Sequence, residues 1–245
     1  MSTKIESVSS PKRLARIAGV FYLLVGISGG FAEGFADPKM YVAGDAAATA
    51  GNVLANLGLV RISVVAHLVD AVFFVLTAMA LYILLQDVHK GIARAMLVFV
   101  VVAVGIITLN SVFQFEALQV ATNASYATAF GAAGSNALVL LLLDIQHYGT
   151  LAAQVFFGLW LAPLGYLAYK SGLFPKALGI VLVAATVCYL VDLLAAFLVP
   201  DFAKQIHLFI VIVPAIAEIW MVFYLLVVGV KTVKSDKRIL AAATA

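Results

Sequence analysis

Long apolar runs alternate with short polar stretches along the chain. A helix needs about 20 mostly apolar residues to cross a hydrocarbon core about 30 Å thick. The runs lack the residue-by-residue alternation of a membrane barrel, and open sheet edges cannot lie in lipid. The pattern therefore predicts an all-α, polytopic integral membrane protein. Its six transmembrane helices are expected at residues 14–33, 57–85, 95–117, 137–169, 176–199 and 206–230.

The composition supports the same class of protein. Hydrophobic residues make up 64% of the 245 positions and charged residues 11%, whereas about a quarter of an ordinary soluble domain is charged. This excludes a soluble globular protein. The formal charge of +3 forms no basic patch for nucleic acid, so the expected partners are membrane lipids. The single cysteine, Cys188, excludes an intramolecular disulfide framework.

The basic residues are distributed unevenly between the two ends of the predicted helices. All 15 of them except Lys39, Arg61 and Lys204 fall in the two tails or in the second and fourth connections. Because basic residues favour the cytoplasmic side, we expect both termini to be cytoplasmic in a multi-pass protein of the cell's inner or plasma membrane. The single transmembrane domain (1–245) would then have extracytoplasmic loops at 34–56, with a short surface helix capped by Asp45, and at 118–136, and a basic cytoplasmic tail at 231–245.

Three stretches of the chain are distinctive. They are the connection at 165–179 (GYLAYKSGLFPKALG), the opening at 15–20 (ARIAGV), and Gly44-Asp45 followed by 48–52 (ATAGN) and Arg61. Together they resemble the bacterial multi-pass membrane proteins of the domain-of-unknown-function family DUF4386, over nearly the whole chain. The resemblance implies an integral membrane protein of bacterial origin, and it brings no agreed activity, ligand or catalytic residue with it.

Several ionisable residues interrupt the apolar runs. Each costs about 2.5 to 3.5 kcal/mol at the centre of a membrane helix, and such residues usually face the interior of the bundle with a partner. His67 and Asp70 are three residues apart, as are Asp144 and His147, so each pair projects from one face of its helix. Asp192 and Glu218 add carboxylates on two further helices. We therefore expect a polar, outward-opening pocket within the membrane.

The first functional hypothesis is a divalent-metal site. Imidazole and carboxylate ligands suit zinc or iron, and a metal-bound water can act in hydrolysis near neutral pH. The substrate of such a hydrolase or oxidase would be lipid-like or a small apolar molecule. In this hypothesis the metal ligands are His67, Asp70, Asp144 and His147, and Glu218 or Asp192 is a further ligand or the general base.

Two alternatives stay open beside the metal enzyme. In one, protonation of the buried acids controls a proton-coupled transporter or a small-ligand-binding membrane protein. In the other, the protein is a structural or assembly subunit whose buried polar groups only fix the register of the helices, through hydrogen bonds with Tyr22, Asn110, Gln114 and Tyr189. The sequence does not decide whether the protein is an enzyme.

Overall fold

The computed structural model describes residues 10–231, and this part of the chain is helical and contains no strand. Six of its helical segments are long and apolar enough to cross a membrane, which confirms the predicted number of spans. The orientation of the termini stays a prediction. The segments are Pro11–Lys39, Leu57–Leu85, Lys90–Thr122, Ala124–Ser171, Lys176–Leu198 and Pro200–Val228.

Two of these segments are built from more than one helical element. The first consists of α1 (Pro11–Phe31), a π-helical turn (Ala32–Ala36) and a 3-10 turn (Asp37–Lys39). The last consists of α7 (Pro200–Ile210) and α8 (Ile212–Phe223), divided at Val211, and a π-helical turn at Tyr224–Val228. The α-helices are α1 (Pro11–Phe31), α2 (Ala46–Ala55), α3 (Leu57–Leu85), α4 (Lys90–Thr122), α5 (Ala124–Ser171), α6 (Lys176–Leu198), α7 (Pro200–Ile210) and α8 (Ile212–Phe223).

The chain divides into two compact units, and four helices contribute a part to each. Of the described residues, unit 1 contains 10–22, Leu76–Val100 and 157–231. Unit 2 contains Leu23–Val75 and Val101–Phe156.

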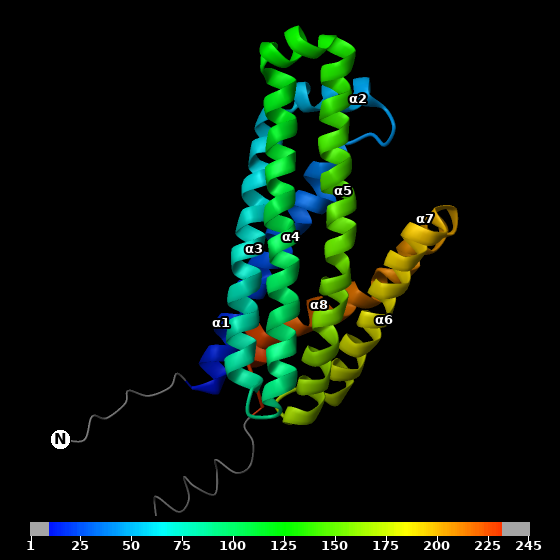
Figure 1. The fold of residues 1–245 in the computed structure, drawn as a ribbon. Helices are drawn as coiled ribbons and strands as arrows, with labels where there is room; N and C mark the ends of the chain where they lie inside the picture. The colour runs from blue at the N-terminus through cyan, green and yellow to red at the C-terminus, as the bar shows by residue number, and fades with distance from the viewer. Residues whose placement is uncertain (1–9, 232–245) are drawn as a thin grey trace, which may run out of the picture. The chain divides into compact units, whose positions relative to one another are not determined.

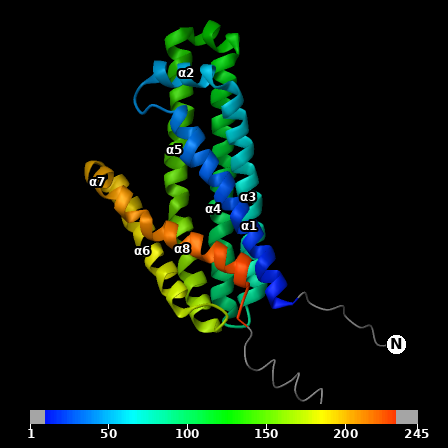
Figure 2. The same ribbon diagram turned by 180° about the vertical axis from the view of Figure 1, so that it is seen from behind.

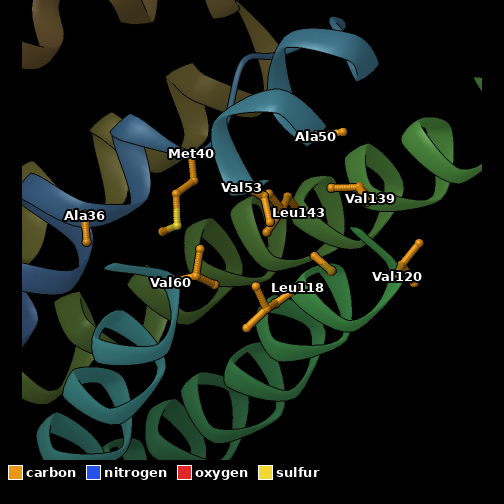
Figure 3. Packing of buried hydrophobic residues seen from close by; sticks show 10 residues of the cluster. Ala36, Met40, Ala50, Val53, Val60, Leu118, Val120, Val139 and Leu143 are labelled. Atoms are coloured by element: carbon orange, nitrogen blue, oxygen red, sulfur yellow. The ribbon is translucent and has the colours of Figure 1, made fainter. Parts of the chain in front are cut away.

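In unit 2, the parts of α3, α4 and α5 run side by side, and α2 lies near the turn that joins α4 and α5 (Figures 1 and 2). Asp45 caps α2 at the position that the sequence predicts, because its Oδ1 accepts a hydrogen bond of 2.9 Å from the amide of Ala48. Apolar side chains from the end of the first span, α2, α3, α4 and α5 form one buried cluster (Figure 3). Its members include Met40, Val53, Val60, Leu118 and Leu143.

The segment 118–136, which the sequence predicts to be a loop, is helical except at Asn123 and Gly131. α4 continues to Thr122 and α5 begins at Ala124, with a kink at Gly131. The kink requires glycine because φ is +71° there, a backbone conformation that side chains disfavour. The apolar runs alone do not predict how far α4 and α5 extend, because a helix can continue beyond the lipid.

In unit 1, α6 packs against both α7 and α8, and α6 and α7 lie side by side in Figure 2. α5 and α6 approach each other closely at two glycines. A Cβ on Gly165 would lie 2.7 Å from the carbonyl oxygen of Gly179, and a Cβ on Gly179 would lie 2.7 Å from that of Gly165. Small residues allow such close contact between membrane helices, where packing drives association.

Candidate functional site

The first span ends in a short irregular segment that positions a carboxylate. After the π-helical turn, Asp37 begins the 3-10 turn with Pro38 as its next residue. Such π-helical turns are rare and occur frequently at functional sites. The side chain of Asp37 is 16% exposed, so it faces the neighbouring helices of unit 2.

Four hydrogen-bond partners from three helices surround this carboxylate. On Oδ1, Ser63 donates at 2.8 Å and the Gln114 amide donates at 2.7 Å. On Oδ2, the Gln146 amide donates at 2.7 Å and the Nε2 atom of His67 lies at 3.0 Å. All four partners are buried. We call these residues the Asp37 cluster: Asp37, Ser63, His67, Gln114 and Gln146.

The spacing of the partners follows from helix geometry. Ser63 and His67 are four residues apart on α3, so both side chains face Asp37 from one side of that helix. The side-chain amide of Gln114 cannot be flipped, because a flipped amide would direct Oε1, an acceptor, at the Asp37 carboxylate. Within residues 10–231, that Oε1 is a buried polar atom without a hydrogen-bond partner. A buried carboxylate that receives so many hydrogen bonds is stabilised in its ionised form.

Further acids lie near His67. Glu33, Asp37 and Asp70 all interact electrostatically with its imidazole. Asp70 is buried and lies against α1, where a Cβ on Gly29 would be 3.1 Å from its Oδ1. A single imidazole therefore lies among three carboxylates within the spans of unit 2.

A second group of polar residues lies nearby in unit 2, around Tyr41. The hydroxyl of Tyr41 donates a hydrogen bond of 2.6 Å to Oδ1 of Asp144. The ring of Tyr41 stacks on the imidazole of His147, with centroids 4.9 Å apart. Burial of the phenol, together with the bond to Asp144, raises the pKa of Tyr41 above its ordinary value, so the hydroxyl remains a donor at neutral pH.

The four predicted metal ligands all lie in unit 2, but they do not form the predicted site. The Nε2 atom of His67 is directed at Asp37, and Asp144 accepts from Tyr41. His147 stacks on Tyr41, and Asp70 lies beside Gly29. Within the described part of the chain, no three His, Cys, Asp or Glu side chains are grouped so that they could hold a metal ion. The structure therefore gives the predicted metal site no support.

The two predicted general bases lie in unit 1, each in a cluster of its own. Glu218 of α8 accepts hydrogen bonds from the hydroxyls of Tyr22 (2.8 Å) and Tyr189 (2.9 Å). Asp192 of α6 is buried, and its Oδ2 lies 2.9 Å from Nδ1 of His207 on α7. Each carboxylate thus already has polar partners from neighbouring helices.

Comparison with known proteins identifies the family. A family model described as Domain of unknown function (DUF4386) matches residues 17–229. The chain belongs to this family. An uncharacterized protein of Archaeoglobus fulgidus is 30% identical over 169 residues, which cover 69% of this chain and 87% of the relative. No solved structure matches this DUF4386 protein.

Asp37, the residue at the centre of the site in this DUF4386 protein, is not among the site residues that the sequence predicts. The pair Asp37-Pro38 is typical of a turn, and both residues fall in the predicted loop 34–56. One available signal was the spacing of Glu33 and Asp37, which places one acid at the predicted helix end and a second on the same helical face one turn beyond it. The other signal was the presence of polar residues within the predicted spans, among them Ser63, Gln114 and Gln146.

Proposed function

We propose that this chain is a proton-linked protein of the cell's inner or plasma membrane, a transporter or a small-ligand-binding protein, in which the Asp37–His67 pair takes up the proton. The observation that carries the proposal is the 3.0 Å contact between Nε2 of His67 and Oδ2 of Asp37 within the spans. Ionisable residues in membrane helices are costly, and they commonly mark ion or proton pathways.

His67 supplies the protonation step. Histidine is the side chain whose ordinary pKa allows a change of charge near neutral pH. Of the four partners of Asp37, the other three are a hydroxyl and two amides. Uptake of a proton by His67 produces an imidazolium–carboxylate pair between α3 and the end of the first span. Release of the proton weakens the contact between His67 and Asp37. The protonation state of His67 is therefore coupled to the packing of α3 against the end of the first span.

The predicted metal-dependent hydrolase or oxidase has less support. A metal bound through Nε2 of His67 would have to displace Asp37, whose carboxylate already receives three other donors. Metal analysis of the purified protein distinguishes the metal-dependent enzyme from the proton-linked function. Stoichiometric zinc or iron that is lost in His67→Gln and Asp144→Asn would favour the metal enzyme over the proton-linked function.

A purely structural role is the second candidate, and one observation favours it. Both oxygens of Asp37 have two partners each, so the carboxylate is fully bonded by groups from α3, α4 and α5. A network of this kind fixes helix register without further function. It predicts a loss of stability when Asp37 is replaced, without a change in proton binding.

The test counts the protons that the purified full-length protein takes up in detergent when the pH falls from about 8 to about 5. A pH-indicator dye gives the count. We expect Asp37→Asn and His67→Gln each to reduce it by about one proton per chain. Asp201→Asn, whose side chain is 92% exposed, is the control and should leave the count unchanged. If the counts of both variants equal that of the unsubstituted protein, with helical content retained by circular dichroism, the proposal is overturned in favour of the structural role.

A further inference from the structure

Tyr41, Asp144 and His147 lie beside the Asp37 cluster, near the end of the first span. The first span ends at Lys39, so Tyr41 is two residues beyond it. The amide of Tyr41 donates to the carbonyl of Asp37 at 3.2 Å, which places the two residues one helical turn apart. The hydrogen bond of 2.6 Å from the Tyr41 hydroxyl to Asp144 places this part of α5 beside the same segment.

His147 is placed to connect this edge with the interior. It is exposed, whereas His67 is 4% exposed. Its imidazole interacts electrostatically with both Asp144 and Asp37. The preceding residue, Gln146, reaches Oδ2 of Asp37 at 2.7 Å, so this turn of α5 lies against the carboxylate.

We propose that Tyr41, Asp144 and His147 form the entry through which protons pass from the membrane edge to the Asp37–His67 pair. The inference rests on the proposed function, because it assigns the route by which that pair is loaded. The change from exposed His147 to buried His67 gives the direction of the route. The electrostatic interaction of His147 with Asp37 and the 3.0 Å contact of Asp37 with His67 give its order.

The proton transfers balance in three steps. His147 takes a proton from water and becomes an imidazolium, which Asp144 stabilises. The imidazolium releases that proton to the Asp37 carboxylate and returns to the neutral form. The Asp37 carboxyl then passes the proton across the 3.0 Å contact to Nε2 of His67, in the tautomer of His67 whose other proton is on Nδ1. Asp37 is again a carboxylate and His67 is an imidazolium, so one proton has moved and no bond between heavy atoms has changed.

The charged groups around the route come from several elements. Asp144 and the ring of Tyr148 face His147 from α5, with the Tyr148 centroid 5.2 Å away, and Tyr41 faces it from the segment after the first span. Glu33 and Asp37 face His67 from the first span, and Asp70 from α3.

The experiment measures the rate of proton uptake after a laser-induced pH jump, with full-length protein in detergent and a pH-indicator dye. We expect His147→Gln to slow uptake by at least about tenfold and to leave the final number of protons taken up by the Asp37–His67 pair unchanged. Asp144→Asn is the second variant and should also slow uptake. Tyr148→Phe is the matched control, because it changes an exposed neighbour of His147 that the route does not use.

The outcomes separate this inference from the proposed function. If His147→Gln and Asp144→Asn take up protons at the rate of the unsubstituted protein, the route is wrong and the proton-binding pair remains. If Tyr148→Phe slows uptake as much as His147→Gln, the effect comes from disturbed packing and the route is also wrong. If the unsubstituted protein shows no uptake that depends on Asp37 and His67, the proposed function fails and the route fails with it.

Discussion

The hydroxyl of Tyr41 provides a test at a single atom. Its pKa is raised by burial and by the bond to Asp144. A group with a raised pKa stabilises the fold fully below its unfolded value, here about 10, and loses this effect as the pH rises through the folded-state value. We therefore expect Tyr41→Phe to lower the free energy of unfolding by about 1 to 2 kcal/mol at any pH below about 10.

Unfolding of Tyr41→Phe in detergent, followed by circular dichroism at two pH values below 10, measures this effect. Tyr148→Phe is the control, since its side chain is 53% exposed, and it should change the free energy of unfolding by less than about 0.5 kcal/mol. Equal effects of the two substitutions would contradict the role assigned to the Tyr41–Asp144 bond.

The residues of the site are partly predictable from the sequence. His67, Asp70, Asp144 and His147 stand out because charged side chains are rare in apolar runs, and the structure places all four in unit 2. The acceptor that His67 contacts is not predictable in the same way. Asp37 follows a π-helical turn. Such a turn rotates the side chains that directly follow it, and the amino-acid composition does not indicate where the turn occurs.

The contact between α5 and α6 allows a test at the level of helices. A methyl group on Gly179 would lie 2.7 Å from the carbonyl oxygen of Gly165 and 2.8 Å from Cβ of Tyr169. Both neighbours belong to α5, so the two helices must move apart. We expect Gly179→Ala to lower the free energy of unfolding by about 1 to 3 kcal/mol.

Gly26→Ala is the matched control for this substitution. No heavy atom lies within 4 Å of the Cβ that would be added at Gly26, and alanine favours a helix over glycine by about 1 kcal/mol. Thermal unfolding of both variants should show Gly26→Ala at or above the stability of the unsubstituted protein. A Gly179→Ala protein of equal stability would show that α5 and α6 do not need this close approach.

Helix number follows from the sequence more directly than helix ends. The six spans are predicted because a window of apolar residues long enough to cross lipid has few other solutions. The ends are different, since they depend on capping and on contacts outside the lipid. α5 consists of two helical parts divided at Gly131, although its predicted span covers only 137–169, because the uncharged stretch before the span also forms helix.

The orientation of the whole molecule is predicted from the distribution of Lys and Arg. Single cysteines introduced by Lys90→Cys and Lys204→Cys, in a chain that also carries Cys188→Ala, test it in intact cells. Both lysines are exposed, and the sequence predicts that they lie on opposite sides of the membrane. A membrane-impermeant maleimide should label Lys204→Cys directly and Lys90→Cys only after permeabilisation. The reverse pattern would contradict cytoplasmic termini.

The DUF4386 family is described as a domain of unknown function and the Archaeoglobus fulgidus relative is uncharacterized, so we argue the function of the whole molecule from the chemistry of its buried residues. The four carboxylates Asp37, Asp144, Asp192 and Glu218 each have a histidine or tyrosine within hydrogen-bonding distance. Of the two histidine–carboxylate contacts, the His67 side chain is 5% exposed and the His207 side chain 53%. The buried pair of unit 2 is therefore the one that a proton-linked function requires.

The most direct test of this account is the protonation state of His67 in a lipid bilayer. Solid-state NMR of protein labelled with 15N-histidine reports it, with the signal assigned by its loss in His67→Gln. We predict that the ring nitrogens of His67 change from a neutral imidazole to an imidazolium between about pH 8 and 5, and that Asp37→Asn shifts this transition to lower pH. An imidazole that stays neutral over the whole range, or a transition that is the same in Asp37→Asn, would contradict the account.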